Sequence, residues 1–225
     1  MHTPVLLNEI LKYLNPRPNQ NFVDATVGDG GHARAILENI APNGKLIAVD
    51  RDVDSVVRAK SNLKEFENRV LFVNDSFGNI LKIVEEGGFN RIKGILFDFG
   101  MSTNQLENSG RGFSFQRDEV LDMRYDIKTQ VTAEDVLNNY SEAELVRIFK
   151  EFGEEPKALK TAAAIIKARG EKRIKTTGEL VRIIEKIIKR RGKIHPATKI
   201  FQALRIEVNQ ELMEIERALV DVPKV

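Results

Sequence analysis

Five aspartates are the residues of this sequence whose types and spacing most clearly indicate chemistry. Four follow short apolar runs of the β type, and the fifth lies in a glycine-rich turn after the first run; they are Asp24, Asp50, Asp75, Asp98 and Asp29. Apolar runs that alternate with helices form a mainly parallel sheet, and all its strands end at one edge. The carboxylates are therefore expected to converge on one crevice, where they attract a cation and repel a phosphate.

The glycine-rich turn follows the first apolar run and reads Val27-Gly-Asp-Gly-Gly-His32. Glycines have no Cβ, so the backbone can turn sharply and a ligand can come close to it. The N–H groups at the start of the next helix then face that ligand. The spacing Gly28-x-Gly30-x-x-Ala33 fits the dinucleotide fingerprint. The turn by itself admits both NAD and S-adenosylmethionine.

The acids favour S-adenosylmethionine over NAD. A carboxylate-lined crevice repels the pyrophosphate of NAD, whereas S-adenosylmethionine has no phosphate and carries a sulfonium and an amino group. Asp50, at the end of the second apolar run, suits the two ribose hydroxyls. For any single aspartate, and most of all for Asp75, a helix cap or a turn residue is the alternative interpretation.

The elements that must position these residues fall into two parts. We expect strands over 21–25, 45–49, 70–73 and 94–97, and helices over 3–14, 32–40, 54–66 and 80–85. Residues 100–126 have little periodicity and predict a long functional loop. Beyond it we expect helices over 133–138, 141–152, 156–169, 177–191 and 196–219, with Thr132, Ser141 and Thr177 as N-caps. The fold class is α/β, followed by a helical subdomain.

Composition narrows the class of protein. The chain has 225 residues, 42% of them hydrophobic, with no cysteine and three histidines without paired spacing. We therefore expect no disulfide framework and no metal site. No run is long enough for a membrane helix, and the N-terminus does not resemble a signal peptide, so we expect a cytoplasmic protein with no membrane partner.

Charge is distributed unevenly along the chain. Residues 160–199 contain thirteen Lys and Arg but three Glu, about +10, while the remainder carries about −8 and the whole chain +2. A basic block of this kind is typical of a protein that binds nucleic acid. The alternative is a solvated helical surface.

Six motifs in one order resemble a known family. They are His-Thr-Pro-Val-Leu-Leu from residue 2, Thr-Val-Gly-Asp-Gly-Gly-His from 26, Asp-Phe-Gly-Met-Ser-Thr-Asn-Gln-Leu from 98, Arg-Gly-Phe-Ser-Phe from 111, Leu-Asp-Met-Arg from 121, and His-Pro-Ala-Thr-Lys-Ile-Phe-Gln-Ala-Leu-Arg-Ile from 195. The sequence from about residue 2 to 219 resembles the MraW/RsmH family of bacterial methyltransferases of small-subunit (16S) ribosomal RNA.

The resemblance implies a class I, Rossmann-like methyltransferase fold with an inserted all-helical subdomain. We expect an S-adenosylmethionine-binding α/β domain over 1–115, a helical substrate-binding subdomain over 116–200 and a returning helix over 201–225. The implied reaction is N4-methylation of a cytidine in the decoding region of 16S ribosomal RNA, within the small ribosomal subunit.

The resemblance also assigns site residues. The donor would touch Gly30, Gly31 and His32 in the glycine turn, and its ribose would bind Asp50. Phe77 would pack on the adenine, Asp98 would lie near the methionine end, and Gln105 would close the site. A catalytic role for Asp98 is a hypothesis. The segment after it lacks the prolines of the Asp/Asn-Pro-Pro-aromatic motif found in other amino-methyltransferases.

Contacts to RNA are expected from the loop and the helical part. The candidates are Arg111, Arg124, Lys189, Arg190 and Arg191, with Lys186 and Lys193 beside them. Arg124 could instead pair with a neighbouring aspartate. Phe113 and Phe115 either stack on an extruded base or anchor the loop, and His195 is either structural or a substrate contact.

The sequence departs from the family at its end. Members normally continue after the Asn209-Gln-Glu-Leu212 stretch through strands that complete the sheet. We therefore expect a C-terminally incomplete sheet with its fourth strand exposed at an edge. Three hypotheses follow: an active ribosomal RNA methyltransferase, a non-catalytic RNA- or ribosome-binding remnant, and a methyltransferase of another nucleic acid. The sequence leaves a homodimer open.

Overall fold

The computed structural model describes residues 4–89, 91–190, 192 and 194–225 and divides into two compact units. The first combines Met1–Gly100 with Leu212–Val225, and the second is Met101–Glu211. The sequence led us to expect limits after residues 115 and 200. The second unit instead begins before residue 115 and ends after residue 200, because Phe113 and Leu204 both belong to its hydrophobic core.

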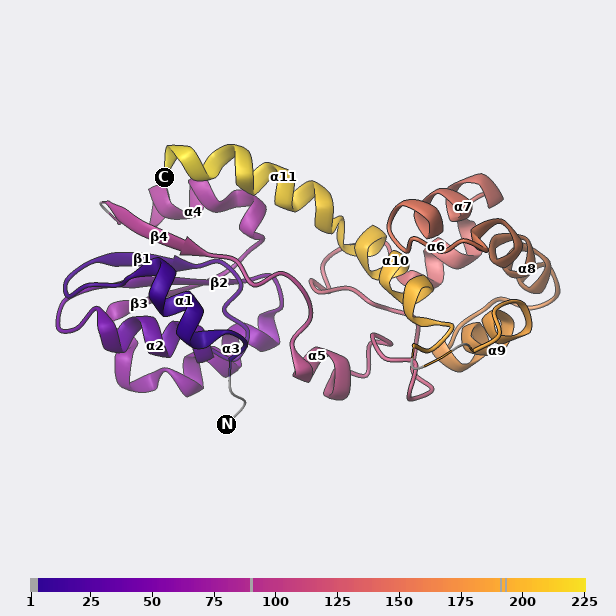
Figure 1. Cartoon of the computed structure of the whole chain (residues 1–225), viewed down its shortest axis with the longest axis horizontal. Helices are drawn as coiled ribbons and strands as arrows, with labels where there is room; N and C mark the ends of the chain where they lie inside the picture. Colours follow the sequence, from indigo (N-terminus) through magenta and orange to yellow (C-terminus); the bar gives the residue numbers. More distant parts are fainter. Residues whose placement is uncertain (1–3, 90, 191, 193) are drawn as a thin grey trace. The chain divides into compact units, whose positions relative to one another are not determined.

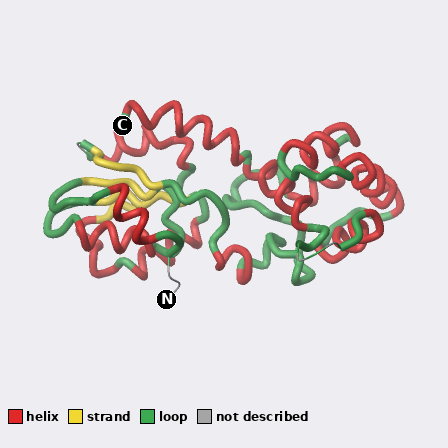
Figure 2. Tube along the Cα trace, in the orientation of Figure 1, coloured by secondary structure: helices red, strands yellow, loops and turns green. Residues whose placement is uncertain are grey.

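A four-stranded sheet forms the centre of the first unit (Figure 2). Its strands are β1 (Asn21–Asp24), β2 (Leu46–Asp50), β3 (Val70–Asn74) and β4 (Ile92–Leu96), all parallel, in the order β3-β2-β1-β4. The chain adds β2 and β3 on one side of β1 and then returns to place β4 on the other side. The strand order therefore reverses at β1 and β4, and in open α/β sheets ligands bind at the carboxyl ends of the strands at that point.

Helices cover both faces of this sheet within the first unit (Figure 1). They are α1 (Leu7–Leu14), α2 (Gly31–Asn39), α3 (Val53–Asn62), α4 (Ile80–Gly87) and α11 (Glu211–Asp221), with 3-10 turns η1 (Lys64–Arg69), η2 (Phe77–Asn79) and η3 (Val222–Lys224). Successive strand residues point to opposite faces. Phe22 thus packs in the core with α2 and α3, and Val23 in the core with α4 and η3. This confirms the α/β class.

The second unit is helical. Its helices are α5 (Thr103–Asn108), α6 (Ala133–Asn139), α7 (Glu142–Glu151), α8 (Ala158–Glu171), α9 (Thr177–Ile187) and α10 (Thr198–Asn209). The apolar faces of α6 to α10 share one core that includes Leu137, Phe149 and Leu180. Burial on one face of each helix is what the spacing of apolar residues predicted.

The helix caps agree with the sequence at two positions of three. Thr132 and Ser141 cap α6 and α7, each with a capping box. The predicted cap of α9 was wrong by one residue, because Thr176 is the N-cap and bonds to the backbone of Glu179. Thr177 is buried instead, and its hydroxyl donates to the carbonyl of Arg117 at 2.6 Å.

Two expectations about longer segments were wrong. The single helix over 196–219 is interrupted at Gln210, which has a positive φ of 52° and separates α10 from α11. The side chain of Asn209 fixes this break, since it donates to the Met123 carbonyl at 2.7 Å and accepts from the Tyr125 N–H at 2.7 Å. The loop over 100–126 contains a short helix, α5.

The described residues were searched for a membrane-spanning helix and for a metal site. Within them, no helix is long and apolar enough to cross a membrane. The same ranges contain no group of three or more His, Cys, Asp and Glu side chains that could hold a metal ion.

Candidate active site

The glycine turn joins β1 to α2, and its conformation requires residues that have no Cβ. Gly28 and Gly30 have positive φ angles of 52° and 87°, a conformation that other residues adopt at a cost. At Gly31 a Cβ would lie 2.5 Å from Cγ of Pro4. Gly30 supplies no side-chain cap for α2. The first backbone N–H groups of α2 are therefore open to a ligand at the turn.

Asp50 ends β2 and is fixed against this turn. Its Oδ2 accepts the N–H of Gly28 at 2.9 Å, and its Oδ1 accepts the N–H of Asp52 at 2.9 Å. Burial raises the pKa of Asp50 to about 6, although both backbone bonds oppose that rise. Each carboxylate oxygen still has a lone pair to offer. The group is thus oriented to accept hydrogen bonds from a pair of hydroxyls.

Asp24 ends β1 and is the most deeply buried acid of the site. Only 1% of its surface is exposed, and its Oδ1 accepts the N–H of Thr26 at 3.2 Å. Its Oδ2 is buried and has no hydrogen-bond partner among the described residues. Burial, with smaller repulsion from Asp50 and Asp98, raises the pKa of Asp24 to about 7. A buried acceptor without a partner is costly unless a ligand supplies a donor.

Asp98 follows β4 on the other side of the strand-order reversal. Its backbone N–H donates to Oγ1 of Thr26 at 2.7 Å, which ties it to the turn. Its Oδ2 lies 3.6 Å from Nε2 of His32, while 55% of its side chain is exposed. Asp98 therefore combines a fixed backbone with a carboxylate that is accessible to solvent.

His32 lies in the first turn of α2 and is 8% exposed. Its Nδ1 is buried and has no partner in the described part of the chain. Burial lowers the pKa of His32 below the usual value for an imidazole, although the nearby Asp98 acts against this. The ring is therefore mainly neutral at pH 7.

The other two predicted acids have partners elsewhere. Arg58 donates from Nε to Oδ1 of Asp29 at 2.7 Å. Asp75 accepts from the N–H of Ser76 at 2.7 Å and from Nδ2 of Asn79 at 2.8 Å, which is the turn role left open as the alternative. The predicted cluster of five acids is thus reduced to three that interact electrostatically, Asp24, Asp50 and Asp98.

Three aromatic rings, two of them on the residues that flank Asp98 in the chain, pack on one another. Phe77, in η2, packs edge-on against Phe97 at 5.9 Å between ring centroids and lies tilted by 57° to Phe99 at 5.4 Å. Phe97 and Phe99 stack on each other at 5.4 Å. Sequence reasoning named Phe77 only and missed the other two. Their position on either side of Asp98 is the signal that could have found them.

The loop that carries Phe77 is held from α11. Ser76 accepts the N–H of Gly78 at 3.1 Å, and its hydroxyl donates to the carboxylate of Glu214. Glu214 is 7% exposed, and a Cβ on Gly78 would collide with its carboxylate. Sequence reasoning did not find Glu214, because 138 residues separate it from Ser76.

Comparisons with known proteins identify the family of this chain. The model of the MraW methylase family matches residues 1–225. The chain belongs to the MraW methylase family. A protein named ribosomal RNA small subunit methyltransferase H from Sulfurihydrogenibium sp. (strain YO3AOP1) is 48% identical over 221 residues, which cover 97% of this chain and 75% of that protein.

Two further relatives with the same name are similar to this methylase over nearly its whole length. The one from Dictyoglomus thermophilum is 44% identical over 99% of this chain and 75% of its own. The one from Clostridioides difficile (strain 630) is 42% identical over 100% of this chain and 73% of its own. The methylase thus spans about three quarters of the length of these relatives.

A methylase of this family uses a methyl donor of the S-adenosylmethionine type. The residues present fit such a group. The unpartnered Oδ2 of Asp24 offers an acceptor for a cationic donor, and the carboxylate of Asp50 is oriented to accept from a ribose. Nothing in the cluster would favour a pyrophosphate.

Gln105 belongs to the second unit of the methylase. Its side-chain Oε1 accepts the N–H of Ser102 at 2.9 Å, and its own N–H donates to the Ser102 hydroxyl at 3.1 Å. This capping box starts α5, and Gln105 is 6% exposed. Its predicted contact with the donor stays a prediction.

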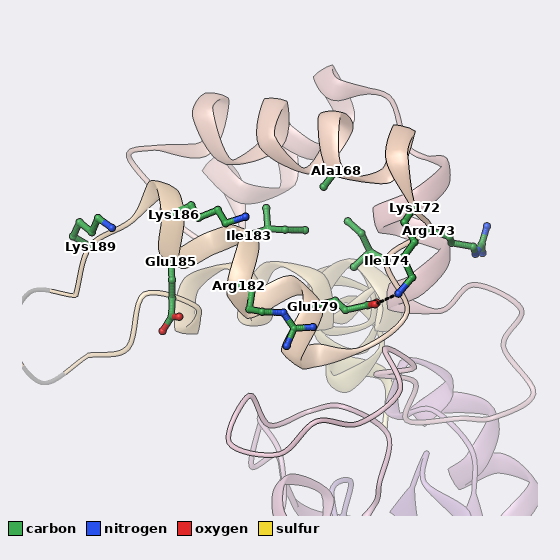
Figure 3. A pocket seen from close by; sticks show the side chains of 10 residues that line it. All are labelled: Ala168, Lys172, Arg173, Ile174, Glu179, Arg182, Ile183, Glu185, Lys186 and Lys189. Atoms are coloured by element: carbon green, nitrogen blue, oxygen red, sulfur yellow. Dashed lines mark hydrogen bonds and ion pairs between the residues drawn. The ribbon is translucent and has the colours of Figure 1, made fainter.

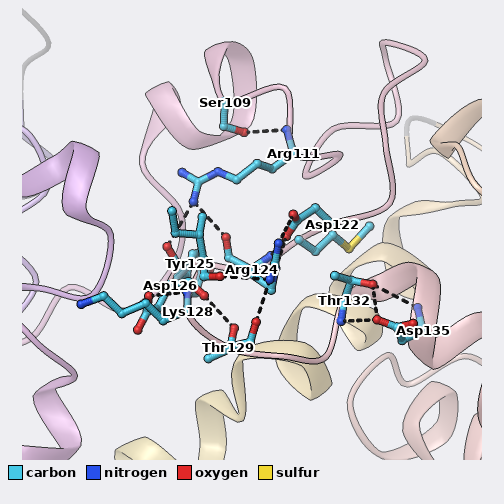
Figure 4. Close-up of polar contacts among 12 residues, drawn as sticks. Ser109, Arg111, Asp122, Arg124, Tyr125, Asp126, Lys128, Thr129, Thr132 and Asp135 are labelled. Atoms are coloured by element: carbon cyan, nitrogen blue, oxygen red, sulfur yellow. Dashed lines mark hydrogen bonds and ion pairs between the residues drawn. The ribbon is translucent and has the colours of Figure 1, made fainter.

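The structure gives intramolecular partners to two of the predicted RNA-binding arginines (Figure 4). Arg111 donates from Nη1 to the carbonyls of Arg124 at 3.0 Å and Tyr125 at 3.1 Å. Arg124 forms a bidentate pair with Asp122 at 2.8 and 2.7 Å and also donates to the Thr129 carbonyl at 2.7 Å. Both guanidinium groups therefore help to shape the loop.

The remaining candidates for RNA contact differ in exposure. Lys189 and Arg190 are exposed, whereas Arg191 and Lys193 lie outside the described residues. Phe113 is buried and stacks on Tyr125 at 5.4 Å. Phe115 stacks on His195 at 4.5 Å. These ring contacts fit the interpretation in which the phenylalanines anchor the loop.

Proposed function

We propose that this chain transfers a methyl group from S-adenosylmethionine to N4 of a cytidine in the decoding region of 16S ribosomal RNA. One observation carries the proposal. Asp24, Asp50 and Asp98 interact at the carboxyl ends of the strands where the strand order reverses, and Asp24 keeps a buried acceptor without a partner. That is the environment a cationic donor needs.

The proposed donor-binding roles rest on the sequence resemblance, and for the turn and Asp50 also on their position at the strand ends. Gly30, Gly31 and His32 present the open backbone of the turn and of the first turn of α2. Asp50 accepts from the ribose hydroxyls, and Phe77 packs on the adenine. When bound, the donor supplies an electrophilic methyl group. The chain's own task is to hold that group and the cytidine amine in a near-attack arrangement.

Asp98 is our candidate for the residue that contacts the reacting amine. The amine of cytosine is a weak nucleophile because its lone pair is delocalised into the ring. A hydrogen bond from the amine to the exposed carboxylate of Asp98 would draw that lone pair out of the ring plane. Gln105 is kept as a proposed donor contact on the sequence resemblance alone.

The ribosomal acceptor is supported by the names of the relatives, which are ribosomal RNA small subunit methyltransferases. The proposed phosphate contacts are Lys189, Arg190 and Arg191. Arg111 and Arg124, which bond to loop carbonyls and to Asp122, are proposed to act by shaping the loop. Lys189 and Arg190 are exposed, and cations on a protein surface bind phosphates without reading the sequence. We therefore assign them to RNA positioning and the choice of nucleotide to the active site.

Transfer of a labelled methyl group tests the proposal. S-adenosylmethionine with a tritiated methyl would be mixed with isolated small subunits lacking the modification, with naked 16S RNA, and with DNA. We expect incorporation into ribosomal RNA that appears as N4-methylcytidine after digestion to nucleosides. Label in DNA alone would indicate a different acceptor, and donor binding without transfer to any of the three would indicate a non-catalytic RNA-binding protein.

The variant Asp98→Asn tests the catalytic hypothesis separately. We expect it to bind the donor and to lose most of its turnover, by roughly 10²-fold or more for a positioned acid–base group. Glu107→Gln, at an exposed carboxylate of α5, is the control. Full turnover in Asp98→Asn would remove Asp98 from the reaction.

A further inference from the structure

A groove of about 490 Å³ lies between α8 and α9, formed wholly by residues of the second unit. Figure 3 shows Ala168 of α8 facing Ile183 of α9 across it, with Ile174 nearby. These three side chains make an apolar floor. The rest of the lining is charged, with five cations and two carboxylates. The groove therefore has an apolar base inside a positively charged rim.

The two carboxylates of the lining already have partners. Glu179 accepts from Nζ of Lys172 at 2.7 Å and also caps the start of α9. Glu185 lies 3.4 Å from Nε2 of His195. Neither acid forms an ion pair with Lys186 or Lys189 within the described residues.

Two of the five cations are engaged with acids outside the lining. Arg173 donates to Glu134 at 2.6 Å and to Asp135 at 3.4 Å. Arg182 interacts electrostatically with Asp118 and helps to lower its pKa. These contacts hold both arginines in place and lower their affinity for a further anion.

Lys186 and Lys189 are different from the other three cations. Both are exposed, and neither has a hydrogen bond or ion pair within the described residues. Lys186 lies in the last turn of α9, and Lys189 follows just after that helix ends at Ile187. They also lie in the basic block over 160–199, whose charge is about +10. Low-dielectric walls focus such a potential into the groove.

We propose that this groove binds the phosphate backbone of RNA, with Lys186 and Lys189 as the phosphate contacts. The proposal rests on the proposed function only in taking RNA as the macromolecule. Unpaired ammonium groups on flexible stems suit phosphates as point charges. The apolar floor of Ala168, Ile174 and Ile183 can take the less polar face of a ribose or base. An acidic protein surface is the competing occupant.

Salt-dependent binding of RNA tests the groove directly. The probe is a fluorescein-labelled single-stranded RNA of about 20 nucleotides, measured by anisotropy with the full chain from about 50 to 200 mM salt. The variant is Lys186→Ala/Lys189→Ala, and the control is Lys128→Ala/Lys150→Ala, at two exposed lysines of the same unit outside the groove.

We expect the groove variant to bind about tenfold more weakly at low salt. Its plot of log affinity against log salt should be shallower by about 1.4, because each phosphate contact on single-stranded RNA contributes about 0.7. The control should keep the wild-type slope. Thermal unfolding and calorimetric titration with S-adenosylmethionine should be unchanged in both, which excludes misfolding as the cause.

Two results would overturn the proposal. One is a groove variant with the affinity and salt slope of the wild type. The other is unchanged binding to the RNA probe with weaker binding to intact small subunits, which would assign the groove to a protein. Failure of the proposed function gives a different result. In that case wild-type protein transfers no methyl group, while the RNA probe still reports on Lys186 and Lys189.

Discussion

The hydroxyl of Ser76 donates a hydrogen bond to the carboxylate of Glu214, and this bond joins α11 to the loop after β3. Ser76 in turn accepts the N–H of Gly78 at 3.1 Å and so caps η2, where Phe77 begins the turn. The last helix of the chain therefore supports the ring that we propose to pack on the adenine of the donor.

Removing Glu214 should loosen that loop. We expect Glu214→Ala to lower the free energy of unfolding by about 1–3 kcal/mol, because it breaks a buried hydrogen bond. It should also weaken donor binding by roughly threefold to tenfold, close to 1 kcal/mol. Glu214→Gln retains an acceptor and should recover most of both losses. Glu216→Ala, on the exposed face of α11, is the control. Unchanged donor affinity in Glu214→Ala would separate Glu214 from the site.

Asp50 should account for much of the donor affinity. Asp50→Ala removes the acceptor of the Gly28 and Asp52 N–H groups and the proposed partner of the ribose hydroxyls. Hydrogen bonds to charged groups contribute about 1.5–3 kcal/mol each. We expect a loss in affinity of at least tenfold to a hundredfold, measured by calorimetry. Asp54→Ala, at an exposed carboxylate of α3, should bind as the wild type does.

Donor affinity should depend on pH through Asp24. Burial raises the pKa of Asp24 to about 7, so the group is largely protonated at pH 6 and loses its proton as the pH rises through 7. A cationic donor binds the carboxylate form, so affinity should rise with pH up to about 7 and level off above it. Below that pH the slope should approach tenfold per unit.

Asp24→Asn is the matched variant for that profile. The amide cannot ionise, so its affinity should be lower at pH 8 and should lose most of the dependence between pH 5 and 7. A weaker dependence from Asp50, whose pKa is about 6, should remain. Wild-type affinity that does not vary between pH 5 and 8 would contradict a role for Asp24 in donor binding.

The same acid bears on stability without a ligand. A folded-state pKa raised above the unfolded value makes the folded state less stable as the pH rises from about 4 to about 7. We expect Asp24→Asn to gain stability relative to the wild type over this range, measured by urea unfolding at pH 5 and pH 8. A constant difference between the two proteins would show that Asp24 is not protonated at pH 5.

Arg124 should behave as a structural residue of the loop. Its bidentate pair with Asp122 and its bonds to loop carbonyls cannot be reproduced by lysine. We expect Arg124→Lys to lower the free energy of unfolding by about 1–3 kcal/mol while donor binding stays unchanged. Arg17→Lys, at an exposed arginine of the first unit, is the control. A stable Arg124→Lys variant that binds the RNA probe more weakly would instead favour a phosphate contact.

The strands and the acids that end them could be predicted because their signals are local. Alternation of apolar runs with helices placed Asp24, Asp50 and Asp98 at one edge, and the glycines marked the turn. That Asp29 and Asp75 have partners outside the cluster could not be predicted from local signals. The partner of Asp29 is Arg58 on α3, 29 residues further along the chain, and no local pattern indicates that pairing.

Contacts between distant parts of the chain account for most of what was missed. The break at Gln210 depends on Asn209 bonding to Met123 and Tyr125, about 85 residues earlier. The apolar periodicity of the sequence alone predicts an unbroken helix through Gln210. The support of Phe77 by Glu214 is another tertiary contact of this kind. Propensity describes a segment, whereas these features depend on what the segment packs against.

Calorimetric titration of the full chain with S-adenosylmethionine tests the central claim most directly, since every role proposed for Asp24, Asp50 and Phe77 requires the donor to bind. At pH 7.5 we predict one site per chain with a dissociation constant in the range of about 1–100 μM, or about −8 to −5.5 kcal/mol. The Asp24→Asn and Asp50→Ala variants should bind at least tenfold more weakly. Absence of binding at millimolar donor, or equal binding by the wild type and both variants, would contradict the account.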